Sequence, residues 1–212
     1  MQQGYRAAAE MTIGTTGPAA VILAGGQSRR MGGGDKGLLR FGAGTVLGAV
    51  IDRIALQVGP LAINANGDAA RFLAYGLSVL PDPVPGFPGP LAGVLAAMDW
   101  AIGQGAAWVV TVPSDTPFAP RDLLARLLAA QTASVVIAAT GERIHPTCGL
   151  WSVGLRDDLA ATLERGDRKV RDFSQRHGAG IVAFDPGPPD PFFNINTPAD
   201  LAQARVWTRG WL

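Results

Sequence analysis

The feature that most constrains the fold is a short apolar run followed at once by a glycine-rich loop. Residues Ala19–Ala24 are all apolar, and glycines begin directly behind them at Gly25. A run of this length that is apolar at every position predicts a strand buried on both faces, as in the centre of a parallel sheet. Ligands of open α/β sheets bind at the carboxyl ends of such strands. The sequence therefore places a candidate binding loop at the edge of a central strand.

Strand-like and helix-like segments alternate after this loop. Further strands are expected at Leu61–Asn64, Leu77–Leu80, Ala107–Val112 and Ser134–Ala139, and helices at Thr45–Val58, Asp68–Tyr75, Leu91–Gly103 and Ala119–Ala130. Repeated β-α-β units with right-handed crossovers form an open, mostly parallel sheet with helices on both faces. The predicted fold class is α/β and Rossmann-like.

Length, charge and cysteine content narrow the class of protein. Residues 18–212 fit a single domain, and residues 1–17 are expected to form a disordered tail. No apolar run approaches the roughly 20 residues of a membrane helix. The net charge of +1 gives no electrostatic footprint for nucleic acid or anionic lipid, so an anionic ligand must be held locally. The single cysteine, Cys148, excludes an intrachain disulfide and fits a reducing cytoplasm.

The loop from Leu23 to Gly37 is suited to holding a triphosphate. Its glycines allow backbone N–H groups to approach a polyphosphate closely, and its cations would neutralise the charge; these cations are Arg29, Arg30 and Lys36. The loop is not a P-loop, because Gly37 stands where that motif has a hydroxyl. The formal Gly-x-Gly-x-x-Gly at Gly32–Gly37 lies too far behind the strand for a dinucleotide site. The alternative is a flexible loop with solvated basic residues.

Asp115 is the candidate metal ligand. It follows the strand that ends at Val112 and lies between Pro113 and Pro117, which restrict the backbone. Mg²⁺ in proteins uses one or two carboxylates together with substrate phosphates, so one aspartate beside a triphosphate is sufficient. The alternative is a turn or helix-capping aspartate.

Other polar residues follow neighbouring strands. Asn64 and Asn66 close the second strand and Asp82 follows the third, so all three are expected at the same edge, where they could bind a base or ribose. Each could equally be a turn former. Arg168 and Lys169 suit the phosphate of a second substrate, with a solvated basic face as the alternative.

The long motif Leu23-Ala-Gly-Gly-x-Ser-Arg-Arg-Met-Gly-x-x-Asp-Lys-Gly37 resembles the signature of the molybdenum cofactor guanylyltransferases, within the larger group of sugar and cofactor nucleotidyltransferases. Pro88–Gly93 and the Asn-x-Asn-Thr-Pro at Asn194–Pro198 are similar to further segments of this family, and the resemblance runs from Ala19 to Leu201. It implies a nucleotide-diphospho-sugar-transferase-like fold. It also implies nucleotide contacts from Leu23, Ala24, Gly25, Gly26, Lys36, Asn64, Asp82 and Asp115.

The resemblance further implies a reaction, in which GMP passes from GTP to the phosphate of molybdopterin and pyrophosphate leaves. Mg²⁺ on Asp115 is the expected cofactor, and Lys36, Arg30 and Asp115 are the expected catalytic residues. The expected pterin-substrate residues are His145, Arg168, Lys169, Asn194 and Asn196. Cofactor-donating and molybdoenzyme-maturation proteins are the expected protein partners, and the expected location is cytoplasmic.

Three alternatives remain open. The related cytidylyltransferases typically resemble Leu-Ala-Ala-Gly where this chain has Leu23–Gly26, so the second glycine favours guanine. A sugar-nucleotide pyrophosphorylase is expected to be longer. A catalytically silent nucleotide-binding module is expected to have lost Lys36 or Asp115, and both residues are present.

Overall fold

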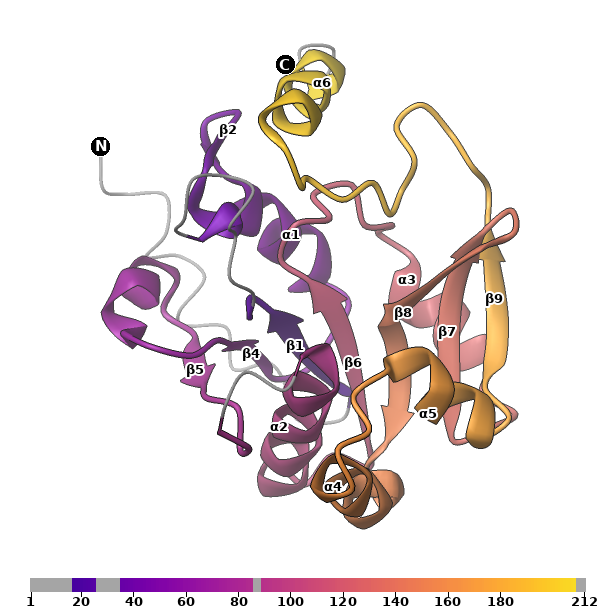
Figure 1. Ribbon diagram of the computed structural model, residues 1–212. Helices are drawn as coiled ribbons and strands as arrows, with labels where there is room; N and C mark the ends of the chain where they lie inside the picture. Colours follow the sequence, from indigo (N-terminus) through magenta and orange to yellow (C-terminus); the bar gives the residue numbers. More distant parts are fainter. Residues whose placement is uncertain (1–16, 26–34, 86–88, 209–212) are drawn as a thin grey trace.

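The structure is a computed structural model, described here for residues 17–25, 35–85 and 89–208. A seven-stranded sheet has the order β5-β4-β1-β6-β8-β7-β9, and β2 and β3 form a separate hairpin (Figure 1). The strands are β1 (Ala19–Leu23), β2 (Arg40–Phe41), β3 (Gly44–Thr45), β4 (Leu61–Asn64), β5 (Ser78–Leu80), β6 (Trp108–Pro113), β7 (Val135–Thr140), β8 (Arg143–Ser152) and β9 (Gly180–Phe184). The expected disordered tail falls outside the described residues, except for Gly17.

Helices connect most of the strands. The α-helices are α1 (Val46–Ile54), α2 (Pro90–Gly103), α3 (Leu123–Ala129), α4 (Arg156–Glu164), α5 (Val170–Arg176) and α6 (Pro198–Thr208), and the 3-10 helices are η3 (Lys36–Leu38), η4 (Ala69–Tyr75) and η5 (Val153–Leu155). Thr45 is the N-cap of α1, where its side chain accepts a hydrogen bond from the Gly48 N–H. No helix within the described ranges has the length and apolar character needed to span a membrane.

The sheet is mostly parallel, as predicted. Strand β1 runs parallel to β4 and β6, β4 pairs in parallel with β5, and β7 pairs in parallel with β9. The exception is β8, which is antiparallel to both β6 and β7. The sequence did not reveal β8, because Pro146 interrupts it. The ladder tolerates this proline through a register shift, since Ile137 pairs with Gly149 but Ala138 pairs with His145.

Helices cover both faces of the sheet, which confirms the predicted fold class. In Figure 1, α2, α4 and α5 lie in front of the sheet and α1 and α3 behind it. Alternation along β1 explains this arrangement, because neighbouring strand residues point to opposite faces. Ala20 and Ile22 join the core beneath α1 and α3, whereas Ala19 and Val21 join the core beneath α2, α4 and α5. All four residues are buried, as the wholly apolar run predicted.

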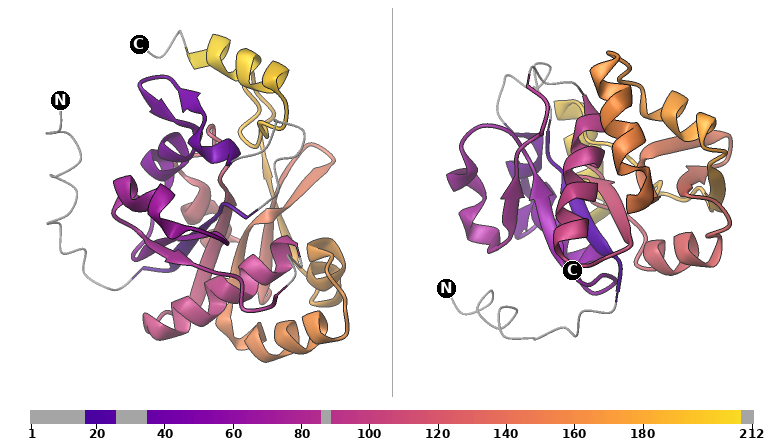
Figure 2. Two further views of the ribbon diagram at one scale, coloured as in Figure 1. Left: turned by 60° about the vertical axis from the view of Figure 1, so that its left-hand side comes forward. Right: turned by 90° about the horizontal axis from the view of Figure 1, so that it is seen from below.

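A third apolar cluster attaches α6 to the carboxyl edge of the sheet. Leu201 and Ala204 of α6 pack with Phe41 of β2, Phe118 and the buried Ile195. Figure 2 shows α6 at one end of the molecule and α4 at the other. The spacing of Asn194 and Asn196 predicts that the two side chains lie on one face of a strand, but this prediction is wrong, because the segment forms no strand. The N–H of Ile195 donates instead to the carbonyl of Asp115, at 3.0 Å.

Candidate active site

A cavity of about 120 Å³ lies at the carboxyl ends of β1 and β6. Its walls combine the end of β1, the start of η3 and the turn after β6, and they consist of Leu23, Ala24, Gly25, Asp35, Lys36, Pro90, Pro113, Ser114, Asp115 and Thr147. The structure therefore brings Leu23–Gly25, Lys36 and Asp115 together, as the sequence predicted. Gly26 and Arg30, also predicted site residues, lie outside the described residues.

Lys36 and Asp115 face each other in this cavity. The Lys36 ammonium lies 3.7 Å from Asp115 Oδ2 and donates a 2.6 Å hydrogen bond to Asn196 Oδ1. Burial raises the pKa of the Asp115 carboxyl, and the charge of Lys36 partly opposes this change. The two side chains are 22% and 19% exposed, so a ligand can reach both.

The turn that carries Asp115 is fixed by hydrogen bonds on each side. Ser114 donates its N–H to the Leu23 carbonyl at 3.0 Å, and Thr116 Oγ1 donates to the Pro113 carbonyl at 2.8 Å. Asp115 caps no helix in the described part of the chain, because α3 begins at Leu123 behind its own N-cap residue, Asp122. This geometry removes the helix-capping alternative and leaves the carboxylate directed into the cavity wall.

The Asp115 carboxylate suits a single magnesium ion. It is largely buried, and the lysine beside it stays 3.7 Å away, a long distance for an ion pair. Within the described ranges, no group of three or more His, Cys, Asp or Glu side chains could hold a metal by itself. Mg²⁺ commonly relies on one or two carboxylates and completes its shell with phosphate and water oxygens. The residues present therefore fit magnesium brought together with a phosphate ligand.

Asn64, Asn66 and Asp82 form one hydrogen-bonded group beside the cavity. Asp82 accepts a 2.9 Å hydrogen bond from Asn64 Nδ2 and a 2.7 Å hydrogen bond from Asn66 Nδ2. The Asp82 N–H donates in turn to Asn66 Oδ1 at 2.8 Å. The structure thus brings Asn64 and Asp82 together as predicted, with Asn66 completing the group.

Helix α2 approaches this group so closely that Gly93 is required. An ideal Cβ added at Gly93 would lie 2.5 Å from Asn64 Oδ1 and 3.0 Å from Leu23 Cδ2. Real Cβ atoms do not approach other heavy atoms to 2.5 Å. The last glycine of the Pro88–Gly93 segment therefore lets α2 pack against both the end of β1 and the end of β4.

A larger and more open cavity of about 660 Å³ adjoins the first one. The two share Pro90 and Thr147, and the remaining walls come from β8 and from α5 with the turn before it: Pro146, Arg168, Lys169, Val170, Arg171, Asp172 and Gln175. Arg168 and Lys169 were predicted to bind the second substrate. Their cavity borders the one that holds Lys36 and Asp115, because Pro90 and Thr147 line both.

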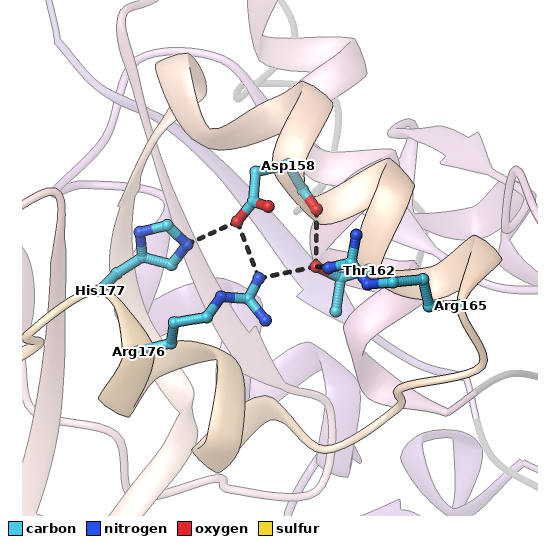
Figure 3. Close-up of polar contacts among 5 residues, drawn as sticks. All are labelled: Asp158, Thr162, Arg165, Arg176 and His177. Carbon is cyan, nitrogen blue, oxygen red and sulfur yellow. Dashed lines mark hydrogen bonds and ion pairs between the residues drawn. The ribbon is translucent and has the colours of Figure 1, made fainter.

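Polar contacts join the end of α5 to α4 (Figure 3). Asp158 Oδ2 accepts hydrogen bonds from Arg176 Nη2 and interacts with His177 Nε2, both at 2.8 Å. Arg176 also donates to Thr162 Oγ1 at 2.7 Å. The hydrogen bond from Arg176, followed by that from His177, holds the pKa of Asp158 below its usual range. These contacts fix the helix whose first turn lines the basic cavity.

His145 lies apart from both cavities. Its ring stacks on Phe192 with 4.6 Å between the ring centroids, and its Nε2 lies 2.8 Å from Thr140 Oγ1. The side chain is buried, and this burial, together with the positive charge of Arg143, lowers its pKa. Of the predicted pterin-substrate residues, Arg168 and Lys169 line the basic cavity and Asn196 reaches Lys36, whereas neither cavity wall includes His145 or Asn194.

Sequence reasoning missed Arg71, Ser114 and Thr147. Ser114 and Thr147 line the cavity, and Arg71 forms an ion pair with Asp35 in the cavity wall. Ser114 stands beside Asp115 in a turn already singled out, so its place could have been inferred. Nothing in the sequence marks Arg71, because its partner is 36 residues away and belongs to a different segment.

Comparison with known proteins identifies the family to which the chain is similar. Residues 20–181 match the model of the MobA-like NTP transferase domain. A molybdenum cofactor guanylyltransferase from Rhodopseudomonas palustris (strain HaA2) is 52% identical over 193 residues, which covers 88% of this chain and 90% of that protein. One from Bradyrhizobium sp. (strain ORS 278) is 50% identical, over 90% of this chain and 92% of that protein.

Solved structures show the same fold. Molybdopterin-guanine dinucleotide biosynthesis protein A from Archaeoglobus fulgidus has a TM-score of 0.72 at 21% identity, over 91% of this chain and 99% of that chain. The 4-diphosphocytidyl-2C-methyl-D-erythritol synthase from Anaerococcus prevotii has a TM-score of 0.70 at 14% identity, over 92% and 97% of the two chains. The sheet has the nucleotide-diphospho-sugar transferase fold. The family match and the relatives of about 50% identity define the chain as a nucleotidyltransferase.

Within that class, the chain belongs to the MobA-like NTP transferase family. The resemblance to molybdenum cofactor guanylyltransferases that the loop motif predicted is confirmed.

Proposed function

We propose that the chain transfers GMP from GTP to the phosphate of molybdopterin, giving the guanine dinucleotide form of the cofactor and pyrophosphate. The observation that carries this proposal is the meeting of Lys36 and Asp115, from segments far apart in the sequence, in one cavity at the end of β1. Relatives about half identical to the chain are named molybdenum cofactor guanylyltransferase. The site supports the nucleotidyl-transfer part of the proposal, and the relatives support guanylyl as the group transferred.

The nucleotide would lie along the carboxyl ends of β1 and β4. Backbone at Leu23–Gly25 borders the cavity closely, and the hydrogen-bonded Asn64 and Asp82 are held beside it. These polar groups could bind the ribose or the base. Gly26 and Arg30 are part of the same proposal on the strength of the motif, and Gly26 is the residue on which the preference for guanine depends.

The transfer needs charge stabilisation and positioning. An oxygen of the acceptor phosphate forms a bond to the α-phosphorus of GTP, while the bond from that phosphorus to the pyrophosphate oxygen breaks and carries its electron pair away. The attacking phosphate is already anionic, so no general base is required. The Lys36 ammonium can stabilise negative charge on the reacting phosphates from its fixed place beside Asp115 and Asn196.

Magnesium belongs to this proposal as the metal of Asp115. When bound, the ion would neutralise phosphate charge and favour departure of pyrophosphate. Asp115 is suited to hold it because its carboxylate is fixed by the turn after β6 and has no closer charged contact than Lys36 among the described residues.

The acceptor would occupy the adjoining basic cavity. Arg168 and Lys169 could bind its phosphate there, and Pro90 and Thr147, which line both cavities, place that cavity next to the one of Asp115. Asn196 could align Lys36 in addition to any acceptor contact. It stays a prediction that His145 and Asn194 contact the pterin. The cytoplasmic location and the cofactor-donating or molybdoenzyme-maturation partners stay predictions too.

Pyrophosphate release in the presence of molybdopterin tests the proposal. The protein with Mg²⁺ and each nucleoside triphosphate in turn should release pyrophosphate with GTP and form a guanine dinucleotide. Asp115→Asn should lower turnover by about 10²–10³-fold, the usual scale for one electrostatic group. The matched control is Asp122→Asn, because Asp122 also lies near a cation, 4.0 Å from Arg126, but lines neither cavity, so turnover should stay unchanged. Preference for CTP, or full turnover in Asp115→Asn, would contradict the proposal.

A further inference from the structure

Arg71 of η4 is the centre of a contact that joins the chain before Lys36 to the end of β4. Its Nε donates a 2.5 Å hydrogen bond to Asp35 Oδ2, and its Nη2 donates a 2.7 Å hydrogen bond to the Asn66 carbonyl. Its Nη1 donates to the Asp68 carbonyl. Every nitrogen of the guanidinium is therefore engaged. We infer that Arg71 positions and neutralises Asp35, and through it aligns Lys36 in the nucleotide site.

Asp35 is the residue through which Arg71 reaches the site. It lies in the wall of the 120 Å³ cavity and directly precedes Lys36, whereas Arg71 is not part of that wall. Asp35 occupies the N-cap position of η3, yet its side chain makes no capping hydrogen bond there. The carboxylate instead points to the guanidinium, and the two side chains are only 14% and 27% exposed. The backbone of η3 thus receives its orientation from Arg71.

Charge gives a second reason for the pair. A carboxylate in the wall of a cavity that receives a triphosphate would repel the ligand, because the separation is short and the surroundings are partly buried. The guanidinium of Arg71 cancels this charge where it stands. Asp35 then adds no net negative charge to the site that Lys36 and Asp115 form. This argument rests on the nucleotide site proposed above.

The same arginine couples two halves of that site. The Asn66 carbonyl accepts from Arg71, while the Asn66 side chain bonds to Asp82, which also holds Asn64. The planar guanidinium can satisfy the carboxylate and both carbonyls at once, which a lysine ammonium at this position cannot do with the same geometry. Arg71 therefore links the phosphate side of the site, at Lys36, with the nucleoside side, at Asn64 and Asp82.

Nucleotide binding and amide exchange together test the inference. In Arg71→Ala, the dissociation constant for GTP should rise about tenfold, because one charged hydrogen-bonded pair is lost beside the ligand. Hydrogen exchange at the Leu38 and Leu39 amides should accelerate in the nucleotide-free protein, since these amides donate to the carbonyls of Asp35 and Lys36. Arg71→Lys should restore most of the GTP affinity but leave exchange fast.

A second substitution separates a positioning role from direct contact. In the Arg71→Ala background, Asp35→Asn removes the unpaired charge and should recover part of the lost GTP affinity. If Arg71 instead contacts the nucleotide itself, the two substitutions will weaken binding independently and no recovery will appear. That result, or unchanged exchange and unchanged GTP affinity in Arg71→Ala, would overturn the inference.

Arg126→Ala is the matched control. Like Arg71, Arg126 forms an ion pair with an aspartate, here Asp122, and donates a hydrogen bond to a backbone carbonyl, here that of Ala183. Its guanidinium also lies over the ring of Phe184. Arg126 belongs to α3 and does not line the cavity. It should change neither GTP affinity nor exchange at Leu38. If the wild-type protein binds no GTP while Arg71→Ala still accelerates exchange at Leu38 and Leu39, the proposed function fails and the positioning of η3 by Arg71 stands.

Discussion

Replacing Gly93 by alanine tests the close packing of α2 against the ends of β1 and β4. The new methyl group would lie 2.5 Å from Asn64 Oδ1. Asn64 cannot turn aside freely, because its Nδ2 donates to the Leu80 carbonyl at 3.0 Å and to Asp82 Oδ1 at 2.9 Å. Loss of one neutral and one charged hydrogen bond costs about 2–4 kcal/mol. The higher helix propensity of alanine returns about 1 kcal/mol.

The expected net effect is a loss of about 1–3 kcal/mol in the free energy of unfolding, or roughly 2–4 °C in Tm for each kcal/mol in a domain of this size. Thermal and urea unfolding of the purified protein measure it. GTP affinity should fall as well, because Asn64 and Leu23 belong to the proposed nucleotide site.

Gly103→Ala provides the control in the same helix. A Cβ at Gly103 meets no atom within 4 Å, so this substitution should leave stability unchanged or raise it by up to about 1 kcal/mol. Removing the obstructing group should also rescue the variant, since Gly93→Ala should cost less in an Asn64→Ala background than in the wild type. Equal unfolding temperatures and equal GTP affinities of Gly93→Ala and Gly103→Ala would contradict the close packing at Gly93.

Two further predictions concern pH. The pKa of Asp158 is held low by Arg176 first and His177 second, so its stabilisation is present above the usual aspartate pKa and is lost as pH falls through the lowered value. Asp158→Asn should therefore lower the free energy of unfolding at about pH 7. The loss should be less than about 1 kcal/mol, because the side chain is 42% exposed. The Tm values of the wild type and the variant should converge near pH 3. Burial lowers the pKa of His145, so its neutral form stabilises the fold above the unfolded pKa of roughly 6.5, and stability falls below it. His145→Gln should flatten the decline in Tm between about pH 7 and pH 5, and an unchanged slope would contradict this.

Local sequence patterns were sufficient for the centre of the fold. The apolar run at Ala19–Ala24 predicted β1 to within one residue, and β4 was predicted with its observed bounds. Such strands are buried on both faces, so their own composition reveals them. Strand β8 could not be found in this way, because Pro146 and neighbouring polar residues break the pattern. Only the register shift against β7 explains how that segment still pairs.

The sequence likewise predicted some residues of the candidate site but not the residues that contact them. Leu23, Lys36 and Asp115 were predictable because each lies at the end of a strand or within a recognisable motif, and the topology of a parallel sheet brings strand ends together. The side chains that orient these residues were not predictable. Asn196 contacts Lys36 across 160 residues, and Arg71 contacts Asp35 across 36. These contacts depend on how α6 and η4 pack, which no local pattern records.

The transfer of an α-phosphorus label from GTP to molybdopterin tests the central claim most directly. With GTP labelled at the α-phosphate, the label should appear in a guanine dinucleotide of the pterin, and with GTP labelled at the γ-phosphate it should appear only in pyrophosphate. Transfer of the γ-phosphate label to the pterin, or incorporation from CTP in preference to GTP, would contradict guanylyl transfer at the site formed by Lys36 and Asp115.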